Sequence, residues 1–344
     1  IVASMFFSGI SGSATADTSA LGSMLIPVMV EDGYSSEFSV AVTTTSSTIG
    51  PVIPPSIMMV VYGGLTGLKE NSVGNLFAGA ILPGLILSGL YFAYISLRCL
   101  INPKLGPPIS KEEASKWSAR QKWLMTLKSL VPPLGLILMV MGTILAGIAT
   151  PTEAAGLGAL GAFILALFNR AVSWKMIVKA SRATMKTTAM VMTLFIGGMF
   201  FSTVFLSMGG GDVVADLFIG SGLNRWLSLA IMMGIVFMMG MFIDWAAILL
   251  VTVPIFLPIA MELGFDPLWF AILMCVNLQT SFLTPPFGYA LFYFAGVAPP
   301  GYTMMHIYRG IIPFVILQVI GLLVIGFFPQ LATYLPDLFF GLSL

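Results

Sequence analysis

The chain has 344 residues, of which 58% are hydrophobic and only 8% are charged. A water-soluble domain of this composition would lack the polar side chains that cover its surface, so we expect most of the chain to lie in lipid. The net charge of +1, without a basic arm, gives no support to a nucleic-acid partner. The chain begins with Ile1 inside an apolar run and is interpreted as a fragment whose beginning is missing.

The first polar interruption of an apolar segment is residues 11–17, with the sequence SGSATAD. We interpret it as the tip of a re-entrant helical hairpin that enters from the cytoplasm and returns there before Glu31. Such a tip directs helix N-termini at the membrane midplane, where backbone N–H groups and the helix dipole favour a carboxylate.

A broken transmembrane helix is predicted next, at residues 46–56, with the sequence SSTIGPVIPPS. Three prolines within five residues remove backbone donors and disfavour the helical conformation of the residues before them. The unpaired carbonyls, with neighbouring hydroxyls, would suit a hard monovalent cation such as sodium. The alternative is a proline kink that nearby Ser and Thr side chains repair, which is common in membrane helices.

Apolar runs near the roughly 20 residues needed to cross a bilayer occur at residues 74–98, 131–149, 187–207 and 310–328. Lys and Arg cluster between Arg98 and Lys128 and again between Arg170 and Lys186, so both segments are predicted to be cytoplasmic loops. Two crossings must then lie between them. The first is predicted at 131–149 and the second at 154–169, with a tight external turn at Pro151-Thr152-Glu153.

A second hairpin tip is predicted at residues 240–247, with the sequence GMFIDWAA, and a second broken helix at 277–288, with the sequence NLQTSFLTPPFG. Asp17 and Asp244 each lie ten residues before a proline, so they are candidates for equivalent positions, with a four-residue insertion later in the second copy. A membrane-buried acid is a functional candidate, but Asp near a helix start also serves as a cap. Asp244 is the better candidate for a cation neighbourhood.

The two hairpin-and-break units align with each other in a single register without a gap. The matching pairs include Pro27 with Pro258, Glu31 with Glu262, Gly33 with Gly264, Tyr34 with Phe265, Phe38 with Trp269, Pro54-Pro55 with Pro285-Pro286 and Tyr62 with Tyr293. The predicted topology places five crossings between the copies, and an odd number inverts the second. Inverted repeats are typical of alternating-access transporters, whose ion and substrate sites lie where the copies meet.

The predicted fold class is therefore an all-α polytopic membrane protein with two inverted repeats, each with a re-entrant hairpin and a broken helix. We divide the chain into a first repeat core at 1–67, connecting scaffold helices at 68–186, a second repeat at 187–300 and a C-terminal span at 301–344. A polytopic enzyme is disfavoured, because the chain has no HExxH motif. With a single His, His306, metal-assisted hydrolysis is nearly excluded. A scaffold or receptor would leave the duplicated breaks without a purpose.

Four motifs, SGSATADTSALGSMLIPVM, STIGPVIPPSIMMVVYG, GIATPTEAAGLG and TPPFGYALFY, closely resemble the large membrane subunit of tripartite ATP-independent periplasmic (TRAP) transporters, along essentially the whole chain. The resemblance implies an elevator-type transport domain that slides against a scaffold and is driven by sodium, the coupling ion, with no organic cofactor. It also implies a small membrane subunit, a periplasmic substrate-binding protein, a small organic anion as substrate, and the bacterial inner membrane as location.

The resemblance maps two sodium sites onto the tips and breaks. The candidates for the first site are Ser11, Gly12, Ser13, Ser46, Ser47, Thr48, Gly50 and Pro54. The candidates for the second site are Gly240, Asp244, Thr280, Ser281, Thr284 and Gly288. The substrate-binding candidates are Ser13, Thr15, Asn277 and Thr284. No Lys or Arg lies in either hairpin or break, so an arginine clamp for the anion would have to come from elsewhere. The alternative within transport is a stand-alone sodium:dicarboxylate symporter or ion antiporter of similar fold.

Overall fold

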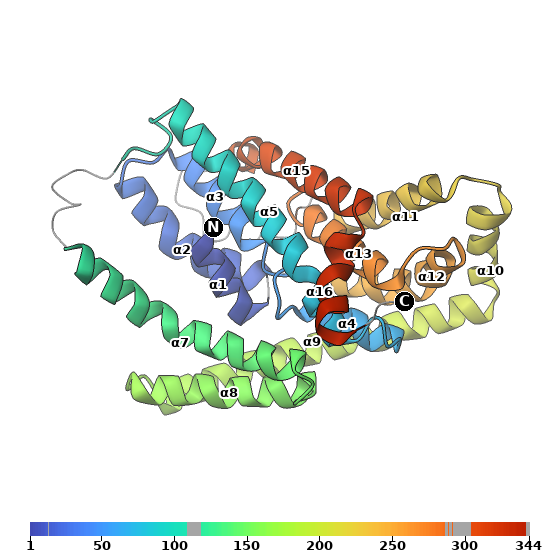
Figure 1. Cartoon of the computed structure of the whole chain (residues 1–344), viewed down its shortest axis with the longest axis horizontal. Coiled ribbons are helices and arrows are strands. Elements are labelled where there is room, and N and C mark those ends of the chain that lie inside the picture. The colour runs from blue at the N-terminus through green and yellow to red at the C-terminus, as the bar shows by residue number, and fades with distance from the viewer. Residues whose placement is uncertain (13, 109–117, 286–287, 289–290, 292–303, 342–344) are drawn as a thin grey trace.

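In a computed structural model, the chain forms a bundle of helices (Figure 1). The structure describes residues 1–12, 14–108, 118–285, 288, 291 and 304–341, and within these residues it contains no β-strand. The helices are α1 (Val2–Ser11), α2 (Ala14–Glu31), α3 (Ser36–Ser47), α4 (Ile57–Thr66), α5 (Val73–Ile101), α7 (Ala119–Leu145), α8 (Pro151–Phe168), α9 (Trp174–Ser207), α10 (Gly210–Ala215), the π-helix η1 (Asp216–Gly220), α11 (Arg225–Gly240), α12 (Trp245–Glu262), α13 (Pro267–Ser281), α15 (Met304–Phe327) and α16 (Gln330–Phe340).

Polar residues cap most of these helices at the N-terminus. The side chains of Ser35, Ser72 and Asp266 each accept a hydrogen bond from the third residue of the helix that follows. Each such bond satisfies one of the backbone donors that a helix start leaves unpaired. Thr150 and Glu153 form a capping box at the start of α8, in which each side chain binds the backbone of the other residue. The local sequence thus fixes where the helices begin.

Six of the described helices are long and apolar enough to cross a membrane: Val73–Ile101, Arg120–Leu145, Pro151–Phe168, Trp174–Ser207, Trp245–Glu262 and Ile307–Phe327. The four apolar runs predicted as spans all lie largely within them. The chain is therefore an all-α polytopic membrane protein, as the composition predicts.

Two details of the predicted connections are wrong. The turn before α8 occupies residues 146–149, and Pro151-Thr152-Glu153 forms the first turn of the helix, because Thr150 caps it and proline is favoured at the first helical position. The second basic segment is not a loop throughout. From Trp174 onward it is helical, and its lysines belong to the 34-residue helix α9, since Lys and Arg are good helix formers.

The core of the protein is built around α13, α12 and α5. Every residue of α13 from Leu268 to Ser281 is buried, and α13 packs against α5, α11, α12, α15 and α16. Trp269 is almost fully buried, and its indole N–H donates to the Ile325 carbonyl in α15 at 2.9 Å. The half-helix before the second predicted break is thus held from all sides.

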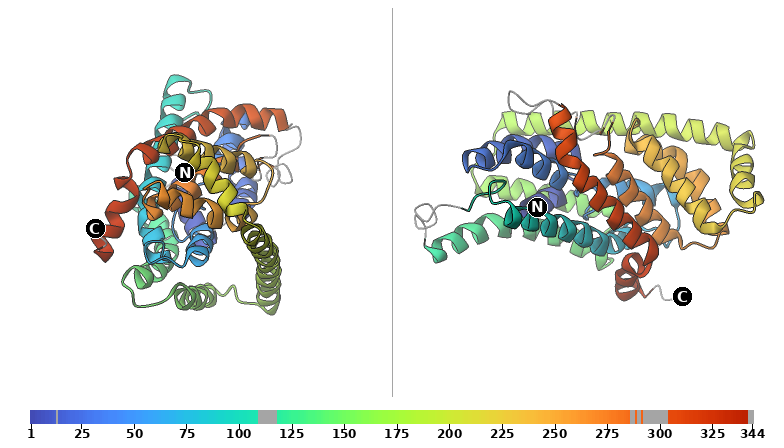
Figure 2. Two further views of the ribbon diagram at one scale, coloured as in Figure 1. Left: turned by 90° about the vertical axis from the view of Figure 1, so that its right-hand side faces the viewer. Right: turned by 90° about the horizontal axis from the view of Figure 1, so that it is seen from above.

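Helices α7, α8 and α9 form a second region, which we call the arm. In Figure 1, α7 and α8 run side by side below the core, and Figure 2 (right) shows α9 as one long rod along the molecule. Only 6% of the most apolar stretch of each arm helix is buried within the protein. The second half of α9 joins the arm to the core, because the Ser202 hydroxyl donates to the Leu250 carbonyl in α12 at 2.8 Å.

Helices in the two halves of the chain begin at corresponding positions. Two helices of the second half start at one constant offset from two of the first, the pairs being Ala14 and Trp245, and Ser36 and Pro267. Helices α2 and α12 also end at this offset, at Glu31 and Glu262, and it is the register in which the two sequences align. Because α2 and α12 match at both ends, the second copy has no four-residue insertion within this helix. Asp17 is therefore not equivalent to Asp244, which corresponds to position 13 in the ungapped alignment.

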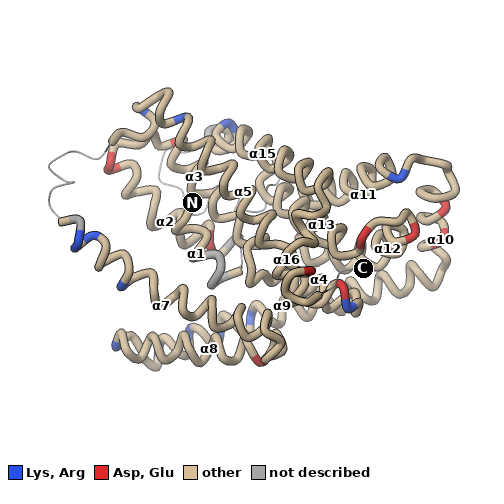
Figure 3. Tube along the Cα trace, viewed as in Figure 1, with Lys and Arg blue, Asp and Glu red and all other residues tan. Residues whose placement is uncertain are grey.

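Charged residues lie mostly near the ends of the helices (Figure 3). Arg98 near the end of α5 and Arg309 near the start of α15 line one small cavity with Ser35 and Glu37. The charge pattern is the one expected where helix ends reach the membrane surface.

Candidate functional site

The first hairpin tip meets the first break. Between α1 and α2 the chain turns at Gly12, whose φ of +60° is a conformation that side chains rarely adopt. A methyl group built on Gly12 would lie 3.3 Å from the Pro55 carbonyl oxygen and 3.3 Å from the Ile57 side chain. The tip therefore touches the end of the break, at Pro55–Ile57.

The second hairpin tip meets the end of α13 in the same manner. A methyl group on Gly240, the last residue of α11, would collide with the Ser281 hydroxyl. Two of the residues predicted for the second sodium site are thus in close contact. The break begins later than predicted: α13 stays helical from Asn277 through Ser281, and Phe282 is its C-cap. The reason is that the first proline comes only at residue 285.

The predicted hydroxyl groups, all buried except the half-buried Thr284, face the ends of their own helices. Ser46, Ser47 and Thr48 donate to the carbonyls of Val42, Thr43 and Thr45 at 2.6–2.8 Å. Thr280, Ser281 and Thr284 do the same to Val276, Leu278 and Thr280 at 2.6–3.0 Å. Such local bonds are common for Ser and Thr in helices and fit both the kink and the ion-site interpretation, because each hydroxyl oxygen keeps acceptor capacity.

The two aspartates differ in position. Asp244 is the N-cap of α12, and its carboxylate accepts the Ala246 N–H at 3.0 Å, so the capping alternative holds for Asp244, and its place in a cation site stays a prediction. Asp17 is fully buried in the first turn of α2, three residues after Ala14, and does not occupy the N-cap position.

One cavity of about 290 Å³ lies where both tips and both breaks come together. Of the residues that line it, Gly12 belongs to the first tip and Asp244 to the second. Pro51 belongs to the first break and Phe282 to the second. Its full lining is Gly12, Ala14, Ala16, Pro51, Ile57, Met58, Thr187, Met190, Val191, Leu194, Asp244, Trp245, Ala246 and Phe282. Four segments that are far apart in the sequence therefore share one space, which we call the central cavity.

Three helices begin at the central cavity. Its lining includes the first residues of α2, of α4 and of α12. The N-terminus of a helix carries partial positive charge and unpaired N–H groups, so it attracts anions. Among the described residues, no Lys or Arg belongs to the lining, and Asp244 is its one acidic residue. The central cavity thus offers backbone dipoles to an anion and a carboxylate to a cation.

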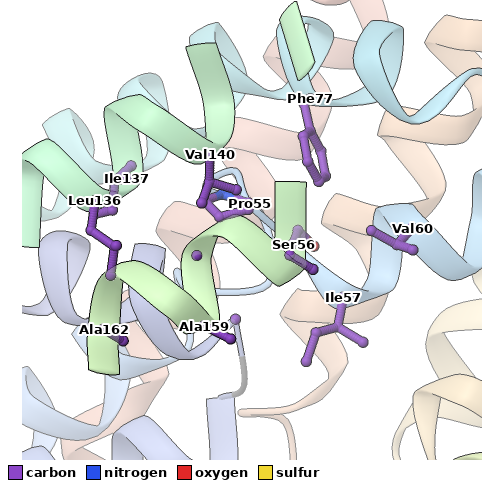
Figure 4. Close-up of a pocket in the computed structure, with 13 residues that line it drawn as sticks. Pro55, Ser56, Ile57, Val60, Phe77, Leu136, Ile137, Val140, Ala159 and Ala162 are labelled. Carbon is purple, nitrogen blue, oxygen red and sulfur yellow. The ribbon is translucent and has the colours of Figure 1, made fainter. Parts of the chain in front are cut away.

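A second cavity of about 380 Å³ lies between the arm and the first break (Figure 4). It is lined by Leu136, Val140, Ala159 and similar apolar side chains of α7 and α8, together with Pro55 and Ile57. Ser56 adds a hydroxyl, but this group donates to the Pro51 carbonyl. The second cavity is larger but has few polar groups, so the central cavity is the better candidate for an ionic ligand.

The substrate-binding candidates are spread over different places. The amide of Asn277 donates to the Met233 carbonyl in α11 at 2.7 Å, so this buried residue joins two helices and does not line the central cavity. Thr284 is half-buried and lies in the turn that follows α13. Ser13 lies outside the described residues, as do the side chains of Ser11 and Thr15. Gly50, Pro54 and Gly288 are described, but none of them lines the central cavity.

The sequence analysis missed the contribution of α9. Thr187, Met190, Val191 and Leu194 supply one wall of the central cavity. They stand inside an ordinary apolar span, and no motif marks them. Their spacing of three and four residues places them on one face of a helix, which was the one available signal.

The fold and the central cavity define the class of the protein: a multi-pass, all-helical membrane protein with a mostly apolar cavity among its helices, at which three helices begin. The family follows from comparison with known proteins. The family model described as "Tripartite ATP-independent periplasmic transporter, DctM component" matches residues 1–331, and the chain belongs to this family. It is a family of transporter components and not of enzymes.

Similar proteins extend over nearly the whole chain. The C4-dicarboxylate TRAP transporter large permease protein DctM of Pseudomonas aeruginosa is 33% identical over 98% of this chain and 76% of its own length. The sialic acid TRAP transporter large permease protein SiaM of Vibrio cholerae is 32% identical over 99% and 77%. The ectoine/5-hydroxyectoine TRAP transporter large permease protein UehC of Ruegeria pomeroyi is 30% identical over 97% and 76%. The predicted family resemblance is confirmed.

Proposed function

We propose that the chain is the large membrane subunit of a sodium-coupled secondary transporter that imports a small organic acid. The observation that carries this proposal is the convergence of both hairpin tips and both breaks on the central cavity. A transporter needs such a site between its two repeats. The cavity volume of about 290 Å³ suits a small solute, near the lower end of the usual range for ligand pockets.

The substrate in this proposal is an anion held by helix N-termini. The starts of α2, α4 and α12 face the cavity, and their dipoles provide positive potential without a basic side chain. The relatives act on C4-dicarboxylates, sialic acid and ectoine, as their names say. Two of these three classes of solute are carboxylate anions and the third is a zwitterion that contains a carboxylate. A carboxylate group is therefore the feature that we expect the helix N-termini to bind.

Sodium would bind beside each tip. The first site combines the Gly12 turn with the Pro55 carbonyl and the hydroxyls of Ser46 and Ser47. The second combines the Gly240 end of α11 with Ser281, Thr280 and the Asp244 region. Support comes from the two tip contacts and from hydroxyl oxygens that retain acceptor capacity after donating to their own helices. A bound cation would also offset the Asp244 carboxylate next to an anionic substrate.

The proposed transport cycle is an elevator movement of one inverted repeat pair against a scaffold. Helix starts that recur at one constant offset in the two halves support the repeat, and the positive-inside rule supports its inversion. The hairpins and breaks would form the moving part, and the exposed arm helices α7 and α8 would belong to the scaffold. The residue ranges 1–67 and 187–300 hold the repeats in this scheme.

The proposed partners are a small membrane subunit and a soluble periplasmic binding protein, in the inner membrane of a bacterium. The family description supports this, since it names one component of a tripartite periplasmic system. The exposed apolar surface of the arm supports a second membrane subunit, because apolar helices not buried in their own chain face lipid or another subunit.

Uptake into proteoliposomes tests the proposal. The full-length protein would be reconstituted with its small subunit, and radioactive succinate, sialic acid or ectoine would be added with the matching binding protein. We expect uptake of one of these only with an inward sodium gradient and only with the binding protein present. Uptake that persists when sodium is equal on both sides would overturn the sodium coupling, and uptake without the binding protein would favour a stand-alone symporter.

A further inference from the structure

A buried side-chain hydrogen bond connects the two broken helices. The side-chain amide of Gln279 donates to the Thr48 hydroxyl at 3.3 Å, and both residues are fully buried. Thr48 is the C-cap of α3, and Gln279 lies two residues before the end of α13. The bond therefore joins the ends of the two half-helices that carry the proposed sodium sites.

The two partners occupy the same position in the two halves of the chain. They are 231 residues apart, which is the spacing between the starts of the corresponding helices. In a protein with two related halves, a residue can contact its own counterpart only near the axis that relates them. The Thr48–Gln279 bond thus lies midway between the two proposed sites and belongs to neither alone.

Two further polar side chains surround this bond. The Tyr91 hydroxyl of α5 lies against the side chains of Gln279 and Gln318, and Gln318 belongs to α15. All four residues are fully buried. We call Thr48, Gln279, Tyr91 and Gln318 the polar bridge.

The polar bridge is set in apolar surroundings. Tyr91 packs edge-on against Phe314 with ring centroids 5.4 Å apart, and it forms a buried cluster with Ala41 and Ile49. In such a medium the bond between Gln279 and Thr48 is stronger than in water.

Stability alone does not explain the polar bridge. Gln279 and Gln318 both lie against Tyr91, but within the described part of the chain the Gln279 carbonyl oxygen, the Tyr91 hydroxyl and both ends of the Gln318 amide reach no hydrogen bond of ordinary geometry. Burying such groups is unfavourable, and apolar side chains of the same shape would cost less. The placement at the junction of the two half-helices indicates a functional reason.

We propose that Gln279 is a positioning residue that makes sodium binding at one site favour sodium binding at the other. This inference rests on the proposed function. Sodium at the first site orders the break that begins at Thr48. The bond transfers that order to Gln279 and so to Thr280 and Ser281, which lie next to it in the second site. The second ion then binds a site that is already ordered, which is positive cooperativity.

Equilibrium binding of radioactive sodium to the purified full-length protein tests this inference. The substitution Gln279→Met keeps the length and shape of the side chain but removes the amide. We expect the wild type to bind with a Hill coefficient well above 1, and Gln279→Met to bind the same amount of sodium at saturation with a coefficient near 1. Thr44→Val is the control, since Thr44 is a buried hydroxyl of the same helix without a bond to α13, and it should keep the wild-type coefficient.

A second pair of variants covers the case in which Gln279→Met does not fold. Thr48→Ser keeps the hydroxyl and should keep the cooperativity. Thr48→Val removes the hydroxyl and should lower the Hill coefficient to near 1. If Thr48→Val binds less sodium at saturation, Thr48 is an ion ligand and the positioning role is overturned. A wild-type coefficient in Gln279→Met would also overturn it. A wild type that binds sodium with a coefficient of 1 refutes this inference alone, whereas a wild type that binds no sodium refutes the proposed function.

Discussion

The core and the arm are built from equally apolar helices but use them differently. In the core helices α5 and α12, 56% and 61% of the most apolar stretch is buried inside the protein, compared with 6% in α7, α8 and α9. Composition alone therefore does not separate helices that pack inside the protein from helices that face lipid or another subunit. The two kinds of region differ in their buried polar side chains. Many of the buried Ser, Thr, Gln and Asn side chains lie in the core, on α3 and α13.

The largest expected difference between the two regions comes from removing a phenylalanine from each. Phe270 of α13 is fully buried, and Phe200 of α9 is 73% exposed. Phe270→Ala should lower the free energy of unfolding by about 3–5 kcal/mol, because it leaves a cavity, and Phe200→Ala should change it by less than about 0.5 kcal/mol. Unfolding of the purified protein in detergent measures both. Equal losses would mean that the arm is as tightly packed as the core.

The contact at the second tip gives the next largest effect. Gly240→Ala places a methyl group on the Ser281 hydroxyl and should cost about 1–3 kcal/mol by overpacking. Gly234→Ala is the matched control in the same helix, since nothing lies within 4 Å of its added methyl group. This control should be neutral or stabilising by up to about 1 kcal/mol. A Gly240→Ala variant as stable as the control would show that the tip does not touch α13.

The first tip can be tested with two glycines of equal backbone strain. Gly12 and Gly67 both have a φ of +60°, but an added methyl group meets the Pro55 carbonyl only at Gly12. Both alanine substitutions should cost roughly 1–2 kcal/mol through the left-handed conformation. Only Gly12→Ala should also weaken sodium binding, measured on the purified protein. Equal sodium affinities in the two variants would remove the first tip from the ion site.

The junction of arm and core should show the smallest effect. Ser202→Ala removes the bond from α9 to the Leu250 carbonyl and should cost about 0.5–1.5 kcal/mol. Ser207→Ala is the control, because that exposed hydroxyl bonds only to Val204 in its own helix. A Ser207→Ala variant that loses as much stability as Ser202→Ala would contradict a specific link between α9 and the core.

Much of the fold is predictable because its signals are local. Apolar runs locate the spans, and side-chain caps such as Ser35 and Asp266 fix helix starts. Prolines 51, 54 and 55 indicate the first break, which extends from Thr48 to Ser56. The second break is harder, since polar residues alone do not end a helix and α13 continues through Thr280 and Ser281.

The site is only partly predictable, because it depends on contacts between distant segments. The two tips and both breaks are marked by glycine, serine and proline, and all four contribute to the central cavity. The wall from Thr187 to Leu194 and the bond from Gln279 to Thr48 carry no local signal. This wall and this bond arise from the arrangement of the half-helices in space. A pattern of residue types along one segment does not reveal that arrangement.

The central claim is that the tips bind sodium, and the unfolding temperature tests it most directly. The full-length protein would be heated in detergent in sodium or in potassium at equal ionic strength, beside the variant Asp244→Asn and the arm variant Phe200→Ala. A ligand at about 100 times its dissociation constant stabilises the folded state by roughly 2.7 kcal/mol. We predict a higher unfolding temperature in sodium, retained in Phe200→Ala and reduced in Asp244→Asn. Equal unfolding temperatures of the wild type in sodium and potassium would contradict the account.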